Sequence, residues 1–180
     1  TGSNCSESRT ISAGDTATFA LEAFAGSNAS NCLPGSRFVG SATVTANTTN
    51  QPLLGIVNQL IPSRAGDAYV GFAPERATAT VILPLIMDRN GGYFTGFSVQ
   101  HIGGPQTEVT CEFANSDYLL RETLEPGQSF TDIQQGKLGE GYVGSARCAA
   151  NDPNARIVAV VNQLSLEGGV LMVYEGISVE

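Results

Sequence analysis

The chain has 180 residues, with nine Lys and Arg against 17 Asp and Glu, which gives a formal net charge of −8. Charged residues make up 14% of the sequence, compared with about 25% in an average soluble domain, and this scarcity argues against a disordered chain, a coiled coil and a helical bundle. The acidic balance disfavours nucleic acid as a partner, because counterion release requires clustered Lys and Arg.

Short strands joined by a turn are predicted in the first part of the chain. Val39 to Thr45 alternates small, polar and β-branched side chains, and Leu53 to Leu60 is an apolar run of strand length. Residues 47–50 between them predict a turn, because Asn tolerates the left-handed backbone conformation. No stretch of the chain shows a helical period with caps.

The second part of the chain predicts further strands. Three of them are Thr80 to Met87, Tyr93 to His101 and Thr107 to Phe113, and a later one is Ile157 to Leu164. Pro84 cannot donate a ladder hydrogen bond, so it places its strand at a sheet edge or at a bulge. The expected fold class is all-β, with tandem β-sandwich modules of Ig-like or jelly-roll-like type.

Two segments of the chain are similar to each other. Phe38 to Leu60, the first copy, aligns without a gap on Tyr142 to Leu164, the second copy, with identical residues at eleven positions. Average composition would give about one or two. The similarity extends to flanking segments, where residues 10–16 match residues 123–129 and residues 69–72 resemble residues 174–177. The sequence therefore indicates an internal duplication.

The two copies differ in what precedes them. Two or three predicted strands between Ala79 and Ala114 precede the second copy, and the first copy has no counterpart of them. We therefore expect an incomplete first module in residues 1–78 and a complete second module in residues 79–180. An incomplete module exposes an apolar face and unpaired strand edges. The cover can come from packing on the second module, from sharing its leading strands, or from a strand of another subunit.

Several motifs carry a resemblance to a known group of proteins. They are the Phe-Val-Gly-Ser-Ala that begins at Phe38, the Val-Val-Asn-Gln that ends at Gln163, and the preceding Leu83-Pro-Leu-Ile-Met and Phe97-Ser-Val-Gln. This pattern resembles the repeat modules of secreted and cell-surface proteins from filamentous bacteria, over most of Val81 to Gly176 and in the first copy. The resemblance implies an extracellular β-rich module of an envelope or appendage protein, with no catalytic residues to carry over.

The four cysteines predict disulfides, since the chain has no CxxC spacing and a single histidine. The pairing that staples each module joins Cys5 with Cys32 and Cys111 with Cys148, while free thiols and an intermolecular bridge remain the alternatives. Three N-x-S/T sequons are candidate glycosylation sites, at Asn4, Asn28 and Asn47. The chain begins at Thr1 without an apolar leader, which suggests a mature or trimmed chain.

Catalytic and metal-binding patterns are absent from the sequence, so neither an enzyme nor a cofactor or metal site is expected. His101 is expected at the surface, at a strand end. Glu108 and Glu112 alternate with apolar residues and should form a solvated strand face rather than a hydrolytic carboxylate pair. Asp88-x-Asn90-x-Gly92 resembles the opening of a calcium loop but lacks the distal Glu, so a turn is expected instead.

The expected function is that of an extracellular structural protein at the cell surface. It would be a self-assembling, pilus-like subunit of a filament, sheath or surface layer, joined head to tail to copies of itself by strand pairing and apolar packing. The alternative, an adhesive or glycan-binding module, is disfavoured because the chain has no Trp to stack on sugars. No membrane-spanning segment is expected, because no apolar run approaches about 18 residues. The candidate subunit contact strand comprises Val170, Leu171, Met172, Val173, Tyr174, Ile177 and Val179.

Overall fold

The computed structural model describes residues 6–19, 40–61, 65–165 and 167–180. The chain divides into two compact units, residues 1–39 and 40–180, so the expected module boundary after residue 78 falls inside the second unit. The described residues are all-β, as predicted, and contain one 3-10 turn at Pro74–Arg76. Their strands are β1 (Ile56–Ile61), β2 (Ala65–Val70), β3 (Thr80–Asp88), β4 (Tyr93–Gly103), β5 (Thr107–Phe113), β6 (Leu119–Leu124), β7 (Ser129–Ile133), β8 (Tyr142–Ala150), β9 (Arg156–Ser165), β10 (Leu171–Glu175) and β11 (Ile177–Val179).

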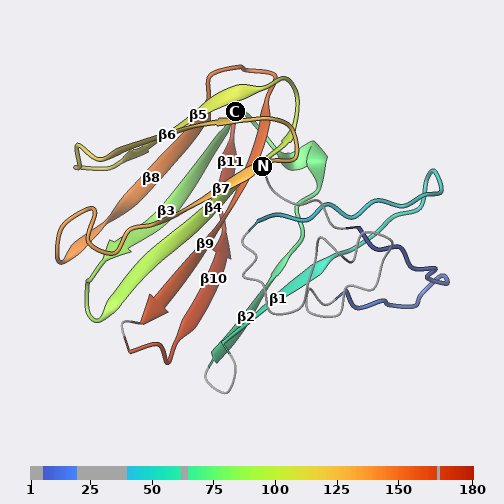
Figure 1. Ribbon diagram of the computed structural model, residues 1–180, viewed down its shortest axis with the longest axis horizontal. Helices are drawn as coiled ribbons and strands as arrows, with labels where there is room; N and C mark the ends of the chain where they lie inside the picture. The colour runs from blue at the N-terminus through green and yellow to red at the C-terminus, as the bar shows by residue number, and fades with distance from the viewer. Residues whose placement is uncertain (1–5, 20–39, 62–64, 166) are drawn as a thin grey trace. The chain divides into compact units, whose positions relative to one another are not determined.

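Strands β3 to β11 form two antiparallel sheets that face each other (Figure 1). One sheet has the strand order β10-β9-β4-β7 and the other β11-β3-β8-β5-β6. The predicted turn after Asp88 is confirmed, with Gly91 and Gly92 at φ values of 56° and 85°, and it leads from one sheet to the other. This arrangement is a β-sandwich, while its Ig-like or jelly-roll-like type stays a prediction.

The strands predicted after residue 79 are confirmed to within two residues at each end, as β3, β4, β5 and β9. Of the sheet edge or bulge predicted at Pro84, the structure has the bulge, because the register between β3 and β8 shifts between Leu83 and Ile86. The return strand predicted from Leu53 begins three residues later, as β1.

The strand predicted from Val39 to Thr45 is wrong for residues 40–45, which form no strand. The aligned strand β8 pairs with β3 on one side and with β5 on the other. Residues 40–46 have no pairing strand within the described part of the chain. A strand-like side-chain pattern does not form a ladder without a partner, and this explains the difference between two segments of similar sequence.

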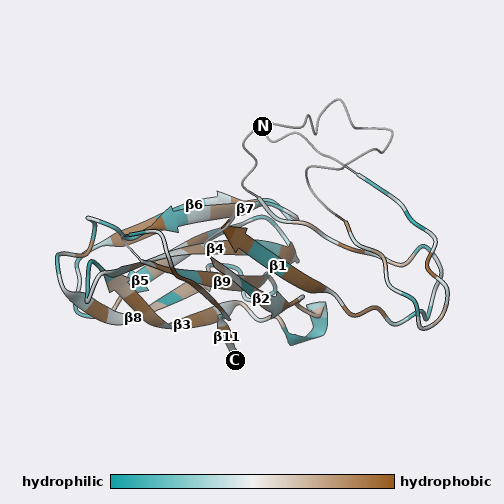
Figure 2. Ribbon diagram, turned by 90° about the horizontal axis from the view of Figure 1, so that it is seen from below, coloured by the Kyte–Doolittle hydropathy of each residue, from teal (hydrophilic) through white to brown (hydrophobic). Residues whose placement is uncertain are grey.

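The hydrophobic core lies between the two sheets and is built by side-chain alternation. In β5, the side chains of Val109, Cys111 and Phe113 are buried, while Glu112 is exposed and Glu108 half-buried, as predicted. Figure 2 shows brown, apolar segments on strands of the sandwich and on β1. The buried cluster comprises Val81, Leu83, Ile86, Phe97, Val99, Val109, Cys111, Phe113, Leu124, Ala146, Cys148, Ile157, Ala159 and Val161.

The C-terminal segment passes from one sheet to the other at Gly176. Before this residue β10 pairs with β9, and after it β11 pairs with β3. A Cβ atom at Gly176 would lie 2.5 Å from Val81 Cγ2 and 3.2 Å from the Cβ of Ala159. The crossing therefore packs too closely against the core for a side chain at this position.

Candidate functional site

The strand pair β1–β2 has the same construction as the strand pair β9–β10. Val57 of β1 lies opposite Tyr69, and the aligned Val161 of β9 lies opposite Tyr174. After the second strand of each pair, a glycine N–H donates to a carbonyl oxygen at aligned positions: Gly71 to Gly55 at 2.7 Å, and Gly176 to Ala159 at 2.8 Å. The aligned residues thus share strand pairing, register and the closing hydrogen bond.

A second correspondence lies in the turns upstream of the two copies. In residues 10–16, Gly14 has a φ of 83° and the Asp15 N–H donates to the Ser12 carbonyl oxygen at 3.0 Å. In residues 123–129, Gly127 has a φ of 87° and the Gln128 N–H donates to the Glu125 carbonyl oxygen at 3.0 Å. The two turns, each taken by itself, have the same geometry at aligned residues.

Burial is where the two copies differ. Three aligned pairs show this difference. In the first copy, the side chains of Val44, Leu53 and Val57 are 66%, 53% and 38% exposed. Their counterparts in the second copy, Cys148, Ile157 and Val161, are fully buried. Leu54, Ile56 and Leu60 are also exposed. Side chains that form the core in the second copy therefore face solvent in the first, and exposed large apolar side chains in one region of the chain are typical of an interaction site.

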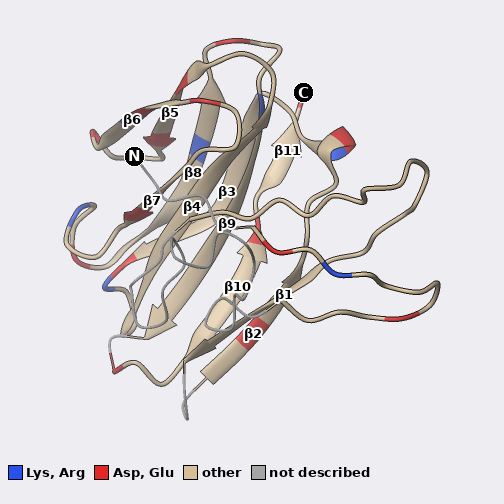
Figure 3. Cartoon of the chain, turned by 45° about the vertical axis from the view of Figure 1, so that its right-hand side comes forward, with Lys and Arg blue, Asp and Glu red and all other residues tan. Residues whose placement is uncertain are grey.

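Strand β1 also has an unpaired edge. Among the described strands it pairs only with β2, whereas the aligned strand β9 lies between β10 and β4. Figure 3 shows β1 without a charged residue and β2 with one, which is Asp67. Natural sheets usually protect an edge with charge, Pro or a bulge. This edge has none of these, so the exposed apolar side chains of Val44 and of residues 53–60, together with the β1 edge, are the candidate functional site.

The β1–β2 hairpin is held against the outer edge of β10 by carboxylate hydrogen bonds. Asp67 accepts a hydrogen bond from the Val173 N–H at 2.7 Å, and Glu175 accepts one from the Val70 N–H at 3.2 Å. The hydrogen bonds from the backbone of Val173 and of Ala68 hold the pKa of Asp67 below its usual value. The hairpin thus leaves the β1 edge open while it covers the edge of β10.

The C-terminal contact strand expected from the sequence is used for pairing within the chain. Leu171, Met172, Val173 and Tyr174 lie in β10, which pairs with β9, and Ile177 and Val179 lie in β11, which pairs with β3, while Val170 precedes β10. Leu171 is buried, whereas Met172 and Ile177 are exposed. A contact between this segment and another subunit stays a prediction.

The predicted disulfide between Cys111 and Cys148 is confirmed, and it joins neighbouring strands β5 and β8 at directly paired positions. The two cysteines are separated by 37 positions in the sequence, and the bridge contributes about 4 kcal/mol in the chain-entropy model. Cys5, Cys32, Asn4 and Asn28 lie outside the described residues. Asn47 is exposed at the turn that precedes β1.

His101 corrects the expectation of a surface histidine, because its side chain is completely buried. Nε2 donates a hydrogen bond to the carbonyl oxygen of Gly103 at 2.7 Å, and Nδ1 lies 3.3 Å from that of Leu124. The side chain of His101 points into the core because it continues the period-two alternation that also buries Phe97 and Val99. The alternation along the strand was the sequence feature that indicated this burial.

A buried carboxylate organises the loop between β7 and β8. Asp88, fully buried at the end of β3, accepts hydrogen bonds from the backbone N–H groups of Gly136, Leu138 and Gly139 at 2.8 to 3.0 Å, and it pairs with Arg89. Burial raises the pKa of Asp88, but these hydrogen bonds and Arg89 outweigh it and lower the pKa overall. The carboxylate that resembled a calcium ligand is thus occupied by backbone donors.

Further polar groups extend this buried cluster. Thr95 Oγ1 lies 3.2 Å from Gln134 Oε1, and Gln134 Nε2 donates to Asp132 at 2.9 Å. Asp132 also accepts from the hydroxyl of Tyr118 at 3.1 Å and forms an ion pair with Lys137. Partial burial lowers the pKa of Lys137, but the bond to Asp132 outweighs this effect and raises it. The groups satisfy one another's hydrogen bonds, so the cluster fixes the loop between β7 and β8.

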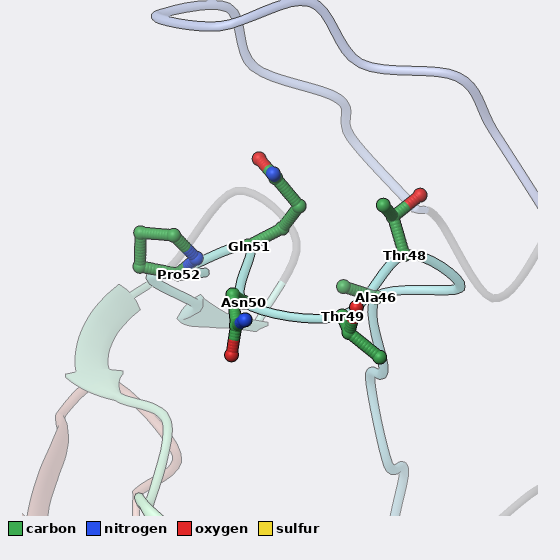
Figure 4. Close-up of a pocket in the computed structure, with 6 residues that line it drawn as sticks. All are labelled: Ala46, Thr48, Thr49, Asn50, Gln51 and Pro52. Carbon is green, nitrogen blue, oxygen red and sulfur yellow. The ribbon is translucent and has the colours of Figure 1, made fainter.

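The turn that precedes β1 has a shallow pocket lined by Ala46, Thr48, Thr49, Asn50, Gln51 and Pro52. Figure 4 shows that the side chains of Asn50 and Gln51 point to opposite sides. A small-molecule site needs polar groups that converge on the ligand. This depression therefore carries no ligand-binding argument. Within the described residues, no cluster of His, Cys, Asp and Glu is arranged to hold a metal ion, and no helix is long and apolar enough to cross a bilayer.

Comparison with known proteins gives little further information. No family model matches the chain, and no curated protein matches its sequence. A solved structure described as "Crystal Structure of Thermotoga maritima 1070" is similar at 16% sequence identity and a TM-score of 0.46, covering 58% of this chain and 97% of that chain. A similarity at this level carries no argument about function.

Proposed function

We propose that the protein is an extracellular structural subunit that assembles with other copies into a filament, sheath or surface layer. The observation that carries this proposal is the exposure of Val44, Leu53 and Val57, whose aligned counterparts form a buried core. Burial of such side chains in a subunit contact gives about 25 cal/mol for each Å² of apolar surface. The proposal includes no enzymatic reaction.

The unpaired edge of β1 supports the same role. Strand addition at an open edge provides backbone hydrogen bonds, and the neighbouring apolar side chains provide specificity. A contact between two different surfaces of the same chain continues from one copy to the next and produces a filament, unless its rotation closes a ring. The disulfide between Cys111 and Cys148 fits an oxidising compartment, which supports the extracellular part of the proposal.

Acidic residues are distributed unevenly along the chain. Residues 83–180 hold twelve of the 17 acidic side chains, whereas residues 1–82 hold four basic and five acidic ones. A contact between the two parts would bring a nearly neutral surface against an acidic one. We therefore attribute most of the contact to apolar packing and strand pairing rather than to charge complementarity.

Negative-stain electron microscopy of the purified, disulfide-intact protein tests this proposal. We expect extended or sheet-like assemblies whose amount rises with protein concentration and persists at high salt, because apolar contacts are not screened. A protein that remains monomeric across concentration and salt contradicts the proposal.

A further inference from the structure

We propose that two molecules of this chain pair through the open edges of their β1 strands, antiparallel and related by a two-fold axis at Asn58. This pairing deepens the proposed function and rests on it in one point, which is that molecules of the same chain meet at the first copy. It goes further because it fixes which residues face each other and in which register.

Alternate residues of β1 direct their backbone groups toward the open edge. Val70 and Ala68 lie opposite Ile56 and Asn58, and the N–H groups of Val70 and Ala68 donate to carboxylates instead of to β1. Ile56 and Asn58 therefore belong to the pairs of the β1–β2 ladder that exchange no hydrogen bond, and Leu60 follows at the same period of two. The N–H and C=O groups of these three residues point away from β2, toward the open edge.

The second copy uses the same side of the strand for antiparallel pairing. The residues of β9 that align with the three outward residues of β1 each lie opposite a residue of β4: Val160 opposite Ser98, Asn162 opposite Gly96 and Leu164 opposite Phe94. The edge of β1 therefore has the geometry of an edge that pairs in the second copy. Among the described strands, β1 has no partner on this side.

A two-fold axis at Asn58 brings the outward groups of two molecules together. Asn58 then lies opposite Asn58 of the other molecule, and Ile56 lies opposite Leu60 in both directions. These pairs exchange about six backbone hydrogen bonds. Ile56 and Leu60 are 63% and 75% exposed and share one face of the strand, so their contact across the axis buries apolar surface on both molecules.

Neighbouring registers fit the strand less well. An axis at Gln59 would set Asn58 against Leu60 and leave Ile56 without a partner inside β1. An axis at Val57 would set Ile56 against Asn58 and leave Leu60 without a partner inside β1. Both registers pair an apolar side chain with an amide and use fewer of the outward backbone groups of β1, so the axis at Asn58 is favoured.

The absence of charge favours another molecule of the same chain as the occupant. A two-fold axis sets the side chain at its centre against an identical one, so a charged residue there would repel its counterpart. Figure 3 shows no charged residue on β1. Of the other edge strands in the described residues, β2 and β10 are held to each other, β6 carries Arg121 and Glu122, β7 carries Asp132, and β11 has three residues. The edge of β1 is thus better matched by a second β1 than by these edges.

Cysteine cross-linking tests the register. Directly opposite residues of a hydrogen-bonded antiparallel pair have Cα atoms about 5.5 Å apart, a distance that a disulfide can span. Asn58→Cys should therefore give a disulfide-linked dimer under mild oxidation. Leu60→Cys is the matched control, because residue 60 would be displaced from its counterpart by about 13 Å along the strand, and it should give at least about tenfold less dimer. Equal yields from the two variants, or no more dimer from Asn58→Cys than from the wild type, overturn the inference.

Opposite charges at the axis provide an independent test. Asn58→Lys and Asn58→Asp each set like charges against each other, so either variant alone should dimerise about fivefold more weakly than the wild type. An equimolar mixture should recover most of this loss, because opposite charges then face each other. Leu119→Lys and Leu119→Asp, at an exposed position on the edge strand β6, are the controls and should dimerise like the wild type. A mixture that dimerises no better than the single variants overturns the inference, because residue 58 would not face itself.

Hydrogen exchange reveals a different occupant of the edge. We expect the amides of Ile56, Asn58 and Leu60 to exchange more slowly as protein concentration rises, since ladder bonds protect amides. The amides of Val57 and Gln59 point toward β2 and should not change. Protection of the first three amides in dilute, monomeric protein overturns the inference, because the chain would then cover its own edge.

Sedimentation of the wild type separates this inference from the proposed function. If the wild type forms large assemblies and Asn58→Cys shows no specific cross-link, the inference fails and the proposed function stands. If the wild type stops at a dimer that Asn58→Cys cross-links, the inference stands and the extended assembly fails. If both hold, the two-fold dimer is the unit that assembles, and growth uses a second contact at the exposed side chains of Val44, Leu53 and Val57.

Discussion

Asp88 is the side chain on which the loop between β7 and β8 depends. It is fully buried and accepts three backbone N–H groups in addition to the bond with Arg89. Buried donors that lose their acceptor cost about 1 to 3 kcal/mol. Residues 134–141 form no helix or strand, and the carboxylate of Asp88 provides the acceptors for three of their backbone N–H groups.

Asp88→Asn should therefore lower the free energy of unfolding by about 3 kcal/mol at neutral pH, because an amide keeps one acceptor oxygen and turns an NH₂ group toward donors. Urea denaturation measures this loss. Asp117→Asn, at an exposed position, is the matched control and should change stability by less than about 0.5 kcal/mol. Equal midpoints for the two variants would contradict the role assigned to Asp88.

The pH dependence follows from the lowered pKa of Asp88. A carboxyl whose pKa is lower in the folded state contributes stability above its unfolded pKa of about 3.9, and this contribution disappears as the pH falls through the folded value. The stability difference between wild type and Asp88→Asn should thus be constant near neutral pH and shrink below about pH 4. A difference that grows on acidification would be inconsistent with this linkage.

At the scale of the strands, Gly176 and Gly71 occupy aligned positions with different surroundings. A Cβ at Gly176 would lie 2.5 Å from Val81 Cγ2, whereas at Gly71 its nearest neighbour, the Gly55 carbonyl oxygen, would be at 3.4 Å. The tight packing is absent from the first copy, as expected if the strand equivalent to β3 is missing there.

Gly176→Ala should destabilise the protein by about 1 to 3 kcal/mol through overpacking, while Gly71→Ala should be nearly neutral. Gly169→Ala is a second control, since a Cβ there meets nothing within 4 Å. Thermal denaturation of the three variants provides the comparison. Equal destabilisation at Gly71 and Gly176 would mean that the first copy is as closely packed as the second.

The attachment of the β1–β2 hairpin depends on Asp67, which accepts the Val173 N–H. Asp67→Asn removes the charge from this acceptor, so the Val173 and Val70 amides should exchange faster, by an amount visible in hydrogen-exchange mass spectrometry. Because the pKa of Asp67 is lowered, wild type should lose the same protection below about pH 4. Glu122→Gln, at an exposed position on β6, serves as the control. If the Val173 and Val70 amides exchange at the same rate in the two variants, Asp67 does not hold the hairpin against β10.

The local side-chain pattern correctly predicted strands that have neighbouring strands to pair with, and it wrongly predicted a strand where such neighbours are missing. Thr107–Phe113 was predicted residue for residue because its alternation is set by one covered face. Residues 40–45 have the same kind of pattern and form no strand, since ladder formation depends on neighbours that no local pattern reports. Asp132 and Gln134 were missed for a related reason, as inward polar residues break the apolar pattern but satisfy each other.

For the whole molecule, the strands around the second copy can be compared with the strands around the first copy. One copy is embedded in two sheets, and the other ends in an uncharged strand, β1, which pairs with β2 on one edge, has no partner among the described strands on the other edge, and carries exposed apolar side chains. The sequence predicts the duplication and the shorter first copy, and both stay predictions. It also predicts an apolar face that needs a cover, but it does not predict that the described residues leave this face exposed, because that depends on which surfaces the second copy leaves available.

Sedimentation velocity of the wild type and of the double variant Leu53→Ser, Val57→Ser tests whether the exposed apolar side chains of the first copy drive assembly. These residues are exposed in the chain, so the variant should fold with unchanged circular dichroism and lose most of the fast-sedimenting species. Val143→Ser, an exposed apolar position on β8, is the control and should sediment like the wild type. We predict assembly that depends on Leu53 and Val57, and identical sedimentation of the wild type and the double variant at every concentration would contradict this prediction.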